Sequence, residues 1–375
     1  MDRRTFLGTT LLLPAAASAQ QAAQPHAHHG GLTPANPSPD PFQRLQGGVP
    51  HHLTPEQIGQ RSTDSPAPPG PAGRWVTRAA LPIPRSEMAW SVENAGRLHV
   101  IGGYGEGRVD RGYHHVYVPA EDRWYDAAQL PRGANHVAVE ALNGKVYAFG
   151  GFYEQNRNAH NNAYAYDPGA NEWTPIAPMP RPRGAAAAVA LNGRIHLIGG
   201  ASNPTAERAS IGWHEVYDPQ ANTWEARKAL PGARDHVGST AHEGRIHIVG
   251  GRFNTFEYNT GLHHVYLPDR DTWETRAPLP TPRSGHGLAK YRGRFFAMGG
   301  EYGLTGPQGI TNGVVFGQME SYDPGTDSWQ SHAAMPTPRH AVAAQTIGDW
   351  IYVAGGGAVT GGGVQSSVHE AFTLG

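Results

Sequence analysis

The chain has 375 residues, with 49 glycines, 32 prolines and no cysteine, and its formal net charge is −1 with histidine neutral. A charge so close to zero lacks the basic excess that binding to a phosphate backbone requires, so we expect no nucleic-acid partner. The absence of cysteine excludes disulfides and thiolate metal sites. Short apolar stretches between Gly- and Pro-rich turns favour an all-β domain.

Residues 1–19 have the composition of an export signal that is removed from the mature protein. A charged start with Arg3 and Arg4 is followed by a short apolar run and by Ala17-Ser18-Ala19, a small-residue cleavage site. The paired arginines resemble a twin-arginine signal, but Asp2 stands where that motif more often has Ser or Thr, so the general secretory route stays open. We expect a periplasmic or secreted bacterial protein. No apolar run approaches the ~20 residues of a membrane span.

Residues 20–73 contain eleven prolines and seven glycines and few aliphatic residues. Such a composition cannot offset its own ordering entropy, so it predicts a largely disordered linker. Its histidines could chelate a divalent ion, although a polar spacer is the plainer interpretation: His26, His28, His29, His51 and His52.

From residue 74 onward, a strand that ends in a Gly-Gly doublet occurs six times. The doublets begin 48 to 56 residues apart, at Gly102, Gly150, Gly199, Gly250, Gly299 and Gly355. In five repeats a tyrosine follows the doublet and a tryptophan lies seven residues after it, as in Tyr117/Trp124, Tyr166/Trp173, Tyr217/Trp224, Tyr266/Trp273 and Tyr322/Trp329. A period near 50 indicates a repeat architecture.

The doublet, the aromatic residue near Asp-Pro and the spaced tryptophan resemble the kelch repeat, whose unit is one four-stranded propeller blade. The resemblance covers residues 74–375 and implies a six-bladed β-propeller. The sixth repeat reaches Phe372 at the tyrosine position without a tryptophan strand of its own, whereas Arg74-Trp75-Val76 supplies such a strand at the other end. We therefore expect the N-terminal strand around Trp75 to complete the last blade, which would remove open sheet edges.

Strands a to d of each blade place the a–b and c–d turns on one side, which we call the hairpin face. The b–c loops and the d–a links lie on the other side, which we call the loop face. The turns of the hairpin face have nearly constant length, whereas the b–c loops vary. Variable loops on a rigid scaffold usually carry function, so we expect the loop face to be the working face.

The d–a links place arginines at equivalent positions in five blades, and polar residues beside them. Guanidinium groups at the mouth of an axial channel would bind a carboxylate, sulfate or phosphate, but arginines here could equally bond loop carbonyls. Glu87, His136 and His236 are the candidates for a general acid or base. The candidate ligand-binding residues are Arg85, Asn135, His136, Arg183, Arg234, Asp235, His236, Arg283, Arg339 and His340.

Histidine also recurs near the doublet and before the strand-c tyrosine. Packing explains these two sets better than a metal ring does, and we expect no metal and no cofactor; the sets are His99, His196 and His247, and His114, His214, His263 and His369.

Propellers host both binding proteins and enzymes, so the fold leaves the function open. We expect a monomeric scaffold that binds a protein or glycan through exposed loop aromatics, namely Tyr104, Phe152, Tyr153, Phe253 and Phe256. The alternative is an enzyme that acts on a small acidic sugar in an axial pocket, similar to the exported kelch sialic acid mutarotase. Copper-radical chemistry of the galactose oxidase type is excluded, because its cofactor needs a cysteine.

Overall fold

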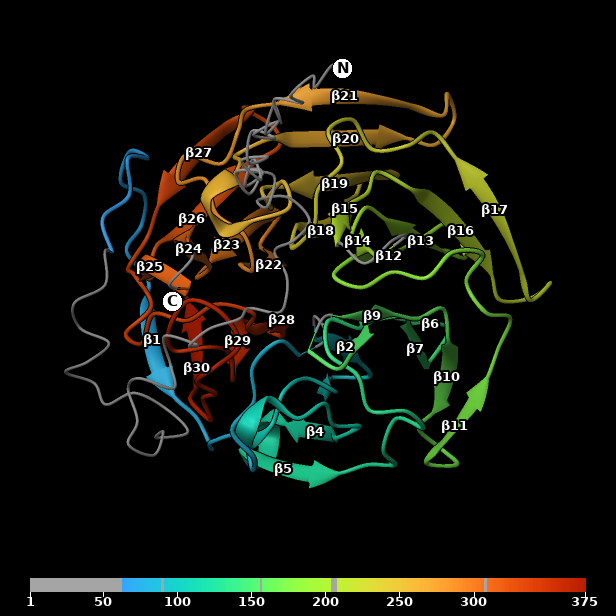
Figure 1. Cartoon of the computed structure of the whole chain (residues 1–375). Helices are drawn as coiled ribbons and strands as arrows, with labels where there is room; N and C mark the ends of the chain where they lie inside the picture. The colour runs from blue at the N-terminus through green and yellow to red at the C-terminus, as the bar shows by residue number, and fades with distance from the viewer. Residues whose placement is uncertain (1–62, 89–90, 156, 204–207, 307–308) are drawn as a thin grey trace, which may run out of the picture.

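The computed structural model describes residues 63–375, apart from 89–90, 156, 204–207 and 307–308. In this part of the chain, six four-stranded antiparallel sheets stand around a common axis (Figure 1). The prediction of an all-β, six-bladed propeller is confirmed. Within these ranges no helix is long and apolar enough to cross a membrane.

Each blade is a meander whose first strand lies nearest the axis. Blade one consists of β2 (Val92–Asn94), β3 (Arg97–Ile101), β4 (His114–Val118) and β5 (Arg123–Asp126). Blade two consists of β6 (Ala138–Leu142), β7 (Lys145–Phe149), β10 (Ala163–Asp167) and β11 (Glu172–Pro175). Blade three consists of β12 (Ala187–Leu191), β13 (Arg194–Ile198), β16 (His214–Asp218) and β17 (Thr223–Arg227). Blade four consists of β18 (Gly238–His242), β19 (Arg245–Val249), β20 (His263–Leu267) and β21 (Thr272–Arg276). Blade five consists of β22 (Gly287–Tyr291), β23 (Arg294–Met298), β26 (Met319–Asp323) and β27 (Ser328–Ser331). Blade six consists of β28 (Ala343–Ile347), β29 (Trp350–Ala354), β30 (His369–Thr373) and β1 (Arg74–Thr77).

Short elements on the loop face connect the second and third strands of the blades. Three are two-stranded hairpins, namely β8 (Phe152–Tyr153) with β9 (Asn158–Ala159), β14 (Ala201–Ser202) with β15 (Ala209–Ser210), and β24 (Glu301–Gly306) with β25 (Gly309–Val315). Two of the three short 3₁₀ helices also lie in these loops: η4 (Glu106–Arg108) and η6 (Phe256–Tyr258); the third, η5 (Pro119–Glu121), precedes β5.

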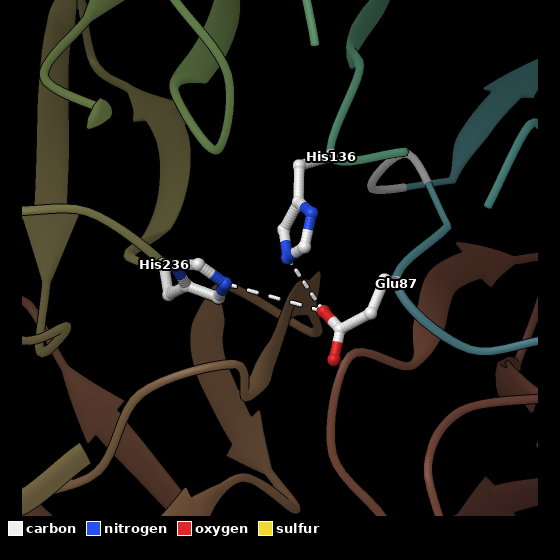
Figure 2. Close-up of side chains that lie close together, drawn as sticks. All are labelled: Glu87, His136 and His236. Atoms are coloured by element: carbon white, nitrogen blue, oxygen red, sulfur yellow. Dashed lines mark ion pairs between the residues drawn. The ribbon is translucent and has the colours of Figure 1, made fainter. Parts of the chain in front are cut away.

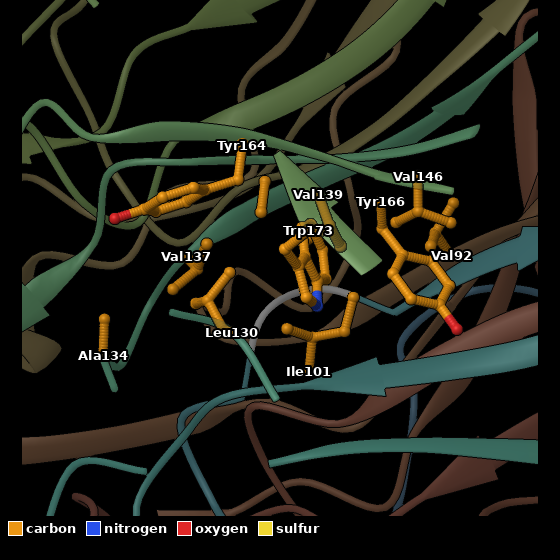
Figure 3. Packing of buried hydrophobic residues seen from close by; sticks show 11 residues of the cluster. Val92, Ile101, Leu130, Ala134, Val137, Val139, Val146, Tyr164, Tyr166 and Trp173 are labelled. Atoms are coloured by element: carbon orange, nitrogen blue, oxygen red, sulfur yellow. The ribbon is translucent and has the colours of Figure 1, made fainter. Parts of the chain in front are cut away.

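The repeated tyrosine and tryptophan hold neighbouring blades together. The indole Nε1 of Trp173 donates to the Ala128 carbonyl of the preceding blade at 2.8 Å. The hydroxyl of Tyr166 donates to Asn171 Oδ1, whose side chain also accepts the backbone N–H of Ala128. Both rings lie in the apolar cluster between blades one and two that Figure 3 shows. The same contacts recur between other blades, which explains why the two residues keep a fixed spacing.

The chain closes the ring as the sequence predicts. β1 pairs with β30 in antiparallel register, with Trp75 opposite Phe372. Trp75 Nε1 donates to the Ala333 carbonyl at 2.9 Å, so it makes the same contact to blade five that the other tryptophans make to their preceding blades. Closure thus uses the same interactions as every internal blade boundary.

Residues 63–73 belong to the segment predicted to be a linker, and they lie along blade five. The Ser331 N–H donates to the Pro68 carbonyl and the Gly70 N–H donates to the Ser331 carbonyl, each at 2.8 Å. Ser65 Oγ donates to the Glu320 carboxylate. The remainder of that segment and the expected export signal lie outside the described residues.

Candidate functional site

Six residues with a left-handed backbone surround the axis on the loop face, one in each d–a link. Their φ angles lie between 49° and 64°. From blade two to blade six, the N–H of each donates to the carbonyl of its counterpart in the preceding blade at 2.6–3.3 Å. This conformation is unfavourable for residues other than glycine, so its repetition indicates a constrained site. We call these residues the inner ring: Glu87, His136, Ala185, His236, Gly285 and Ala341.

The three ionisable side chains of the inner ring point toward one another (Figure 2). His136 Nε2 lies 2.6 Å from Glu87 Oε2, and His236 Nε2 lies 4.0 Å from the same oxygen. His340 precedes the inner-ring residue of blade six, and its Nε2 lies 2.8 Å from Glu87 Oε1. Histidines from blades two, four and six therefore surround one carboxylate from blade one.

The Nδ1 atom of each histidine faces a hydrogen-bond acceptor. His136 Nδ1 lies 2.5 Å from Asn135 Oδ1, and His340 Nδ1 lies 3.2 Å from the Gly357 carbonyl. The Asn135 amide is oriented by its NH₂ group, which donates to Asp110 and to the Phe152 carbonyl. Both ring nitrogens of His136 and of His340 thus face acceptors, and for His340 a doubly protonated ring satisfies both contacts.

His236 has a different environment, although it occupies the same kind of position. Its Nδ1 lies 2.5 Å from Asp235 Oδ1, while its Nε2 lies 3.1 Å from Arg252 Nη2, which can only donate. Arg252 also pairs with Glu301 at 2.9 Å and with Asp235 at 3.2 Å. A neutral His236 with its proton on Nδ1 matches these partners.

We call Glu87, Asp235, His136, His236, Arg252, Glu301 and His340 the axial cluster. All seven side chains are at most 4 % exposed. Burial is the largest influence on Glu87 and favours its neutral form, but His136 and His340 outweigh it and hold its pKa well below the usual value. Burial likewise opposes the charge of His340, but Glu301 and Glu87 raise its pKa. Burial, reinforced by Arg252, lowers the pKa of His236 far below the usual value. The cluster therefore combines an ionised carboxylate, a charged histidine and a neutral one.

The five arginines of the d–a links do not line the axis. All five are at most 1 % exposed, and their guanidinium groups bond within their own blades. Arg283 pairs with Glu320 at 2.6 Å and donates to the Thr281 and Ala297 carbonyls, and Arg339 pairs with Glu370 at 2.9 Å. These contacts favour the structural alternative over a ligand clamp. Arg183 pairs with Glu215, Arg85 contacts His115, and Arg234 donates to four backbone carbonyls.

The structure thus brings six of the candidate residues together at the axis: Glu87, Asn135, His136, Asp235, His236 and His340. It also adds residues that the sequence analysis missed. The missed residues are Arg252 and Glu301, which follow the Gly-Gly doublet directly, as Tyr104 does in blade one. In each of these blades, backbone bonding connects that position to the d–a link, as between Arg252 and Asp235. The repeat alignment itself carried this signal, because the residue after the doublet is the one that differs most between blades.

The loop aromatics do not form an exposed patch. Tyr104 and Phe152 are at most 2 % exposed, and Tyr153, Phe253 and Phe256 are half-buried. The recurring histidines pair within blades, with His99 Nδ1 2.9 Å from His114 Nε2 and equivalent pairs in blades three and four. These pairs pack against the tyrosine of the next blade, as predicted for packing residues.

Two sets of side chains on the axis place possible metal-ligand atoms within 4.8 Å of one another: Glu87, His136 and His236, and Glu87, Glu301 and His340. Arg252 donates to His236 and pairs with Glu301, so a guanidinium adjoins one member of each set. A fixed cation at that position repels a second one. The arrangement favours protons over a metal ion.

The described geometry can be compared with known proteins. The family model described as KLHDC2/KLHL20/DRC7 Kelch-repeats domain matches residues 73–251 and 177–356. These matches span most of the chain, which therefore belongs to the kelch-repeat family. A solved structure entitled "Structure of YjhT" aligns with a TM-score of 0.65 and 14 % sequence identity, over 79 % of this chain and 95 % of that chain. This likeness concerns the fold. No curated protein matches the chain.

Proposed function

We propose that this propeller is an acid–base enzyme that acts on a small polyhydroxylated molecule, a carbohydrate, at the loop-face end of its axis. The observation that carries the proposal is the His136–Glu87–His340 arrangement, in which an ionised carboxylate lies within 2.8 Å of two imidazole Nε2 atoms. A base and an acid held side by side can remove one proton and deliver another during a single event.

Ring opening of a cyclic sugar suits this pair. The base takes the proton of the anomeric hydroxyl, the bond between the anomeric carbon and the ring oxygen breaks, and the acid protonates the ring oxygen. Closure on the other face of the resulting carbonyl returns both protons and gives the opposite anomer. We assign Glu87 as the base and His340 as the acid from their charge states: the lowered pKa of Glu87 keeps it ionised and able to accept a proton, and the raised pKa of His340 favours the protonated ring that can donate one.

Burial favours a small ligand over a macromolecular partner. The loop aromatics are buried or half-buried, so they do not supply the exposed hydrophobic patch that an interface with a macromolecule needs. A scaffold function would have to use the outer parts of the loops. The enzyme alternative is therefore the better supported of the two.

The charges around the site indicate whether the substrate is neutral or acidic. Arg252 is paired with Glu301 and Asp235, and Arg208 with Asp235. The five arginines of the d–a links are bonded within their blades. Because these guanidinium groups already have anionic or carbonyl partners, we favour a neutral sugar over the acidic sugar of the sialic acid mutarotase type. We retain the periplasmic or secreted location, with 74–375 as the propeller domain, as part of this proposal.

The test is a nuclear magnetic resonance exchange measurement of anomer interconversion, with galactose as the neutral probe and N-acetylneuraminic acid as the acidic one. We expect the full chain to accelerate interconversion of the neutral sugar and Glu87→Gln to abolish that acceleration. Glu172→Gln, the same exchange at an exposed position, is the matched control. Acceleration of the acidic sugar alone would reverse the substrate assignment. No acceleration with either sugar, or activity that requires added zinc, would overturn the proposal.

A further inference from the structure

A cavity lies on the hairpin face, at the end of the axis opposite to the axial cluster. It has a volume of about 440 Å³ and is lined by the first strands of all six blades. A smaller cavity of about 70 Å³ shares Glu140, Ser239 and Gln345 with it and extends inward to His286. We call the two together the hairpin cavity. The axial cluster contributes no side chain to this lining.

Glu140 of β6 is a carboxylate in this cavity without a cationic partner. Its two oxygens accept the backbone N–H groups of Ala141 at 2.8 Å and Ala190 at 3.1 Å. Among the residues that the structure describes, no Lys, Arg or His lies within ion-pairing distance of it. Burial raises its pKa to about 7, and the two N–H groups only partly oppose that shift. Glu140 is half-buried. A carboxylate that is partly withdrawn from water and has no cation is costly, so its site favours a ligand that brings a positive charge.

The remaining lining is polar and offers hydrogen bonds that the protein leaves unused. Ser91 Oγ and Thr346 Oγ1 are buried and have no hydrogen-bond partner within the described residues. Buried polar atoms are almost always hydrogen-bonded, to water or a ligand when not to protein. Burial lowers the pKa of His286 to about 3, so this ring adds no charge.

The other charged side chains of the cavity lie at its rim. Glu93 accepts the N–H of Gly96 at 2.7 Å, within its own hairpin. Lys290 is exposed. Neither of them neutralises Glu140, which is the carboxylate farthest from solvent in this lining.

We propose that the hairpin cavity is a second ligand site, which binds a small polyhydroxylated primary amine through an ion pair with Glu140 and hydrogen bonds to Gln345 and Ser239. A volume of about 440 Å³ accommodates a six-carbon amino polyol. This site does not depend on the proposed acid–base activity, because it lies at the other end of the axis and uses none of its residues.

Isothermal titration calorimetry with 1-amino-1-deoxysorbitol tests the proposal, with sorbitol as the neutral probe of nearly the same shape. We expect the amine to bind at pH 7 and sorbitol to bind at least tenfold more weakly. Glu140→Gln retains the shape and removes the charge, so it should weaken amine binding at least tenfold. Ser239→Leu should block the cavity while leaving Glu140 in place, which gives a second variant if the first one folds poorly.

Glu87→Gln separates this proposal from the proposed enzymatic activity. It should leave amine binding unchanged even if anomer interconversion is lost. Equal binding of sorbitol and the amine, no amine binding by the folded wild-type chain, or loss of binding in Glu87→Gln rather than Glu140→Gln would each overturn the second site.

Discussion

Two glutamates lie on the same axis, one at each end, and their environments have opposite effects. Glu87 on the loop face contacts two histidines, and its pKa is held well below the usual value. Glu140 on the hairpin face accepts only neutral N–H groups, and burial raises its pKa to about 7. Burial favours the neutral form of both carboxylates, so their partners decide the charge state. The carboxylate at the loop-face end has histidine partners that stabilise its charge, whereas the carboxylate at the hairpin-face end has no cationic partner.

The largest expected effect concerns buried charge away from the axis. Arg283→Ala should destabilise the chain by about 3–5 kcal/mol, because it leaves Glu320 buried without its partner. Urea unfolding measures this loss. If the arginines of the d–a links are structural, anomer interconversion by the remaining folded protein should keep its wild-type rate constant. If the variant folds but no longer binds the sugar, the result would instead support the hypothesis that these arginines bind the ligand.

At the loop-face end, Glu87→Gln should lower the rate constant of sugar interconversion by about 10²–10⁴-fold, the range expected for loss of one acid–base group. The amide retains the shape but cannot take the proton. The exchange measurement described above provides the rate, and a circular dichroism spectrum checks that the variant folds. A rate within threefold of wild type would assign Glu87 a structural role only.

At the hairpin-face end, Glu140→Gln should stabilise the chain, in contrast to Glu87→Gln. The folded pKa of about 7 lies above the unfolded value of 4.5, so ionisation of Glu140 costs stability as pH rises from about 4.5 to 7. The expected gain is at most about 3 kcal/mol at pH 8 and close to zero at pH 4. Thermal unfolding at the two pH values checks this, and equal gains at both would contradict the electrostatic cause.

The smallest expected effect is the acid sensitivity of the axial cluster. The folded pKa of Glu87 is depressed, so its contribution to stability is present above pH 4.5 and is lost as pH falls. His340 has a raised pKa, so its contribution is present below pH 6.5 and is lost as pH rises through its folded pKa. Glu87→Gln should therefore lose about 1 kcal/mol less than wild type between pH 5 and pH 3 in urea unfolding. Parallel curves would show that folding does not lower the pKa of Glu87.

The repeat made the fold predictable, down to the use of Trp75 to complete blade six. It also placed Glu87, His136, His236 and His340 on one face, because strand order fixes where the d–a links lie. The interaction of these side chains could not be predicted, since it depends on left-handed backbone angles that no spacing reveals. Glu301 and Arg252 were missed because the residue after each doublet was assigned to the variable b–c loop rather than to the axis.

The role of the five arginines was predictable from the repeats themselves. Glu215, Glu320 and Glu370 each stand two residues before the aromatic position of strand c, in the blades where Arg183, Arg283 and Arg339 need a partner. In blade two, where Ala134 replaces the arginine, Tyr164 occupies the equivalent position. In blades one and four the arginine is kept and a histidine, His115 or His264, stands at this position, so glutamate occurs there only in blades that have the arginine.

The inner ring has a consequence for how this fold acquires chemistry. Each of its residues is held by backbone hydrogen bonds to the neighbouring blade, and side chains take no part in them. The inner ring therefore provides six positions whose backbone is fixed. Glu87, His136 and His236 occupy three of them, and alanine or glycine occupies the other three. A substitution can change the side chain at one of these positions without moving the backbone, so new reactions can arise on this axis while the structure of the blades stays the same.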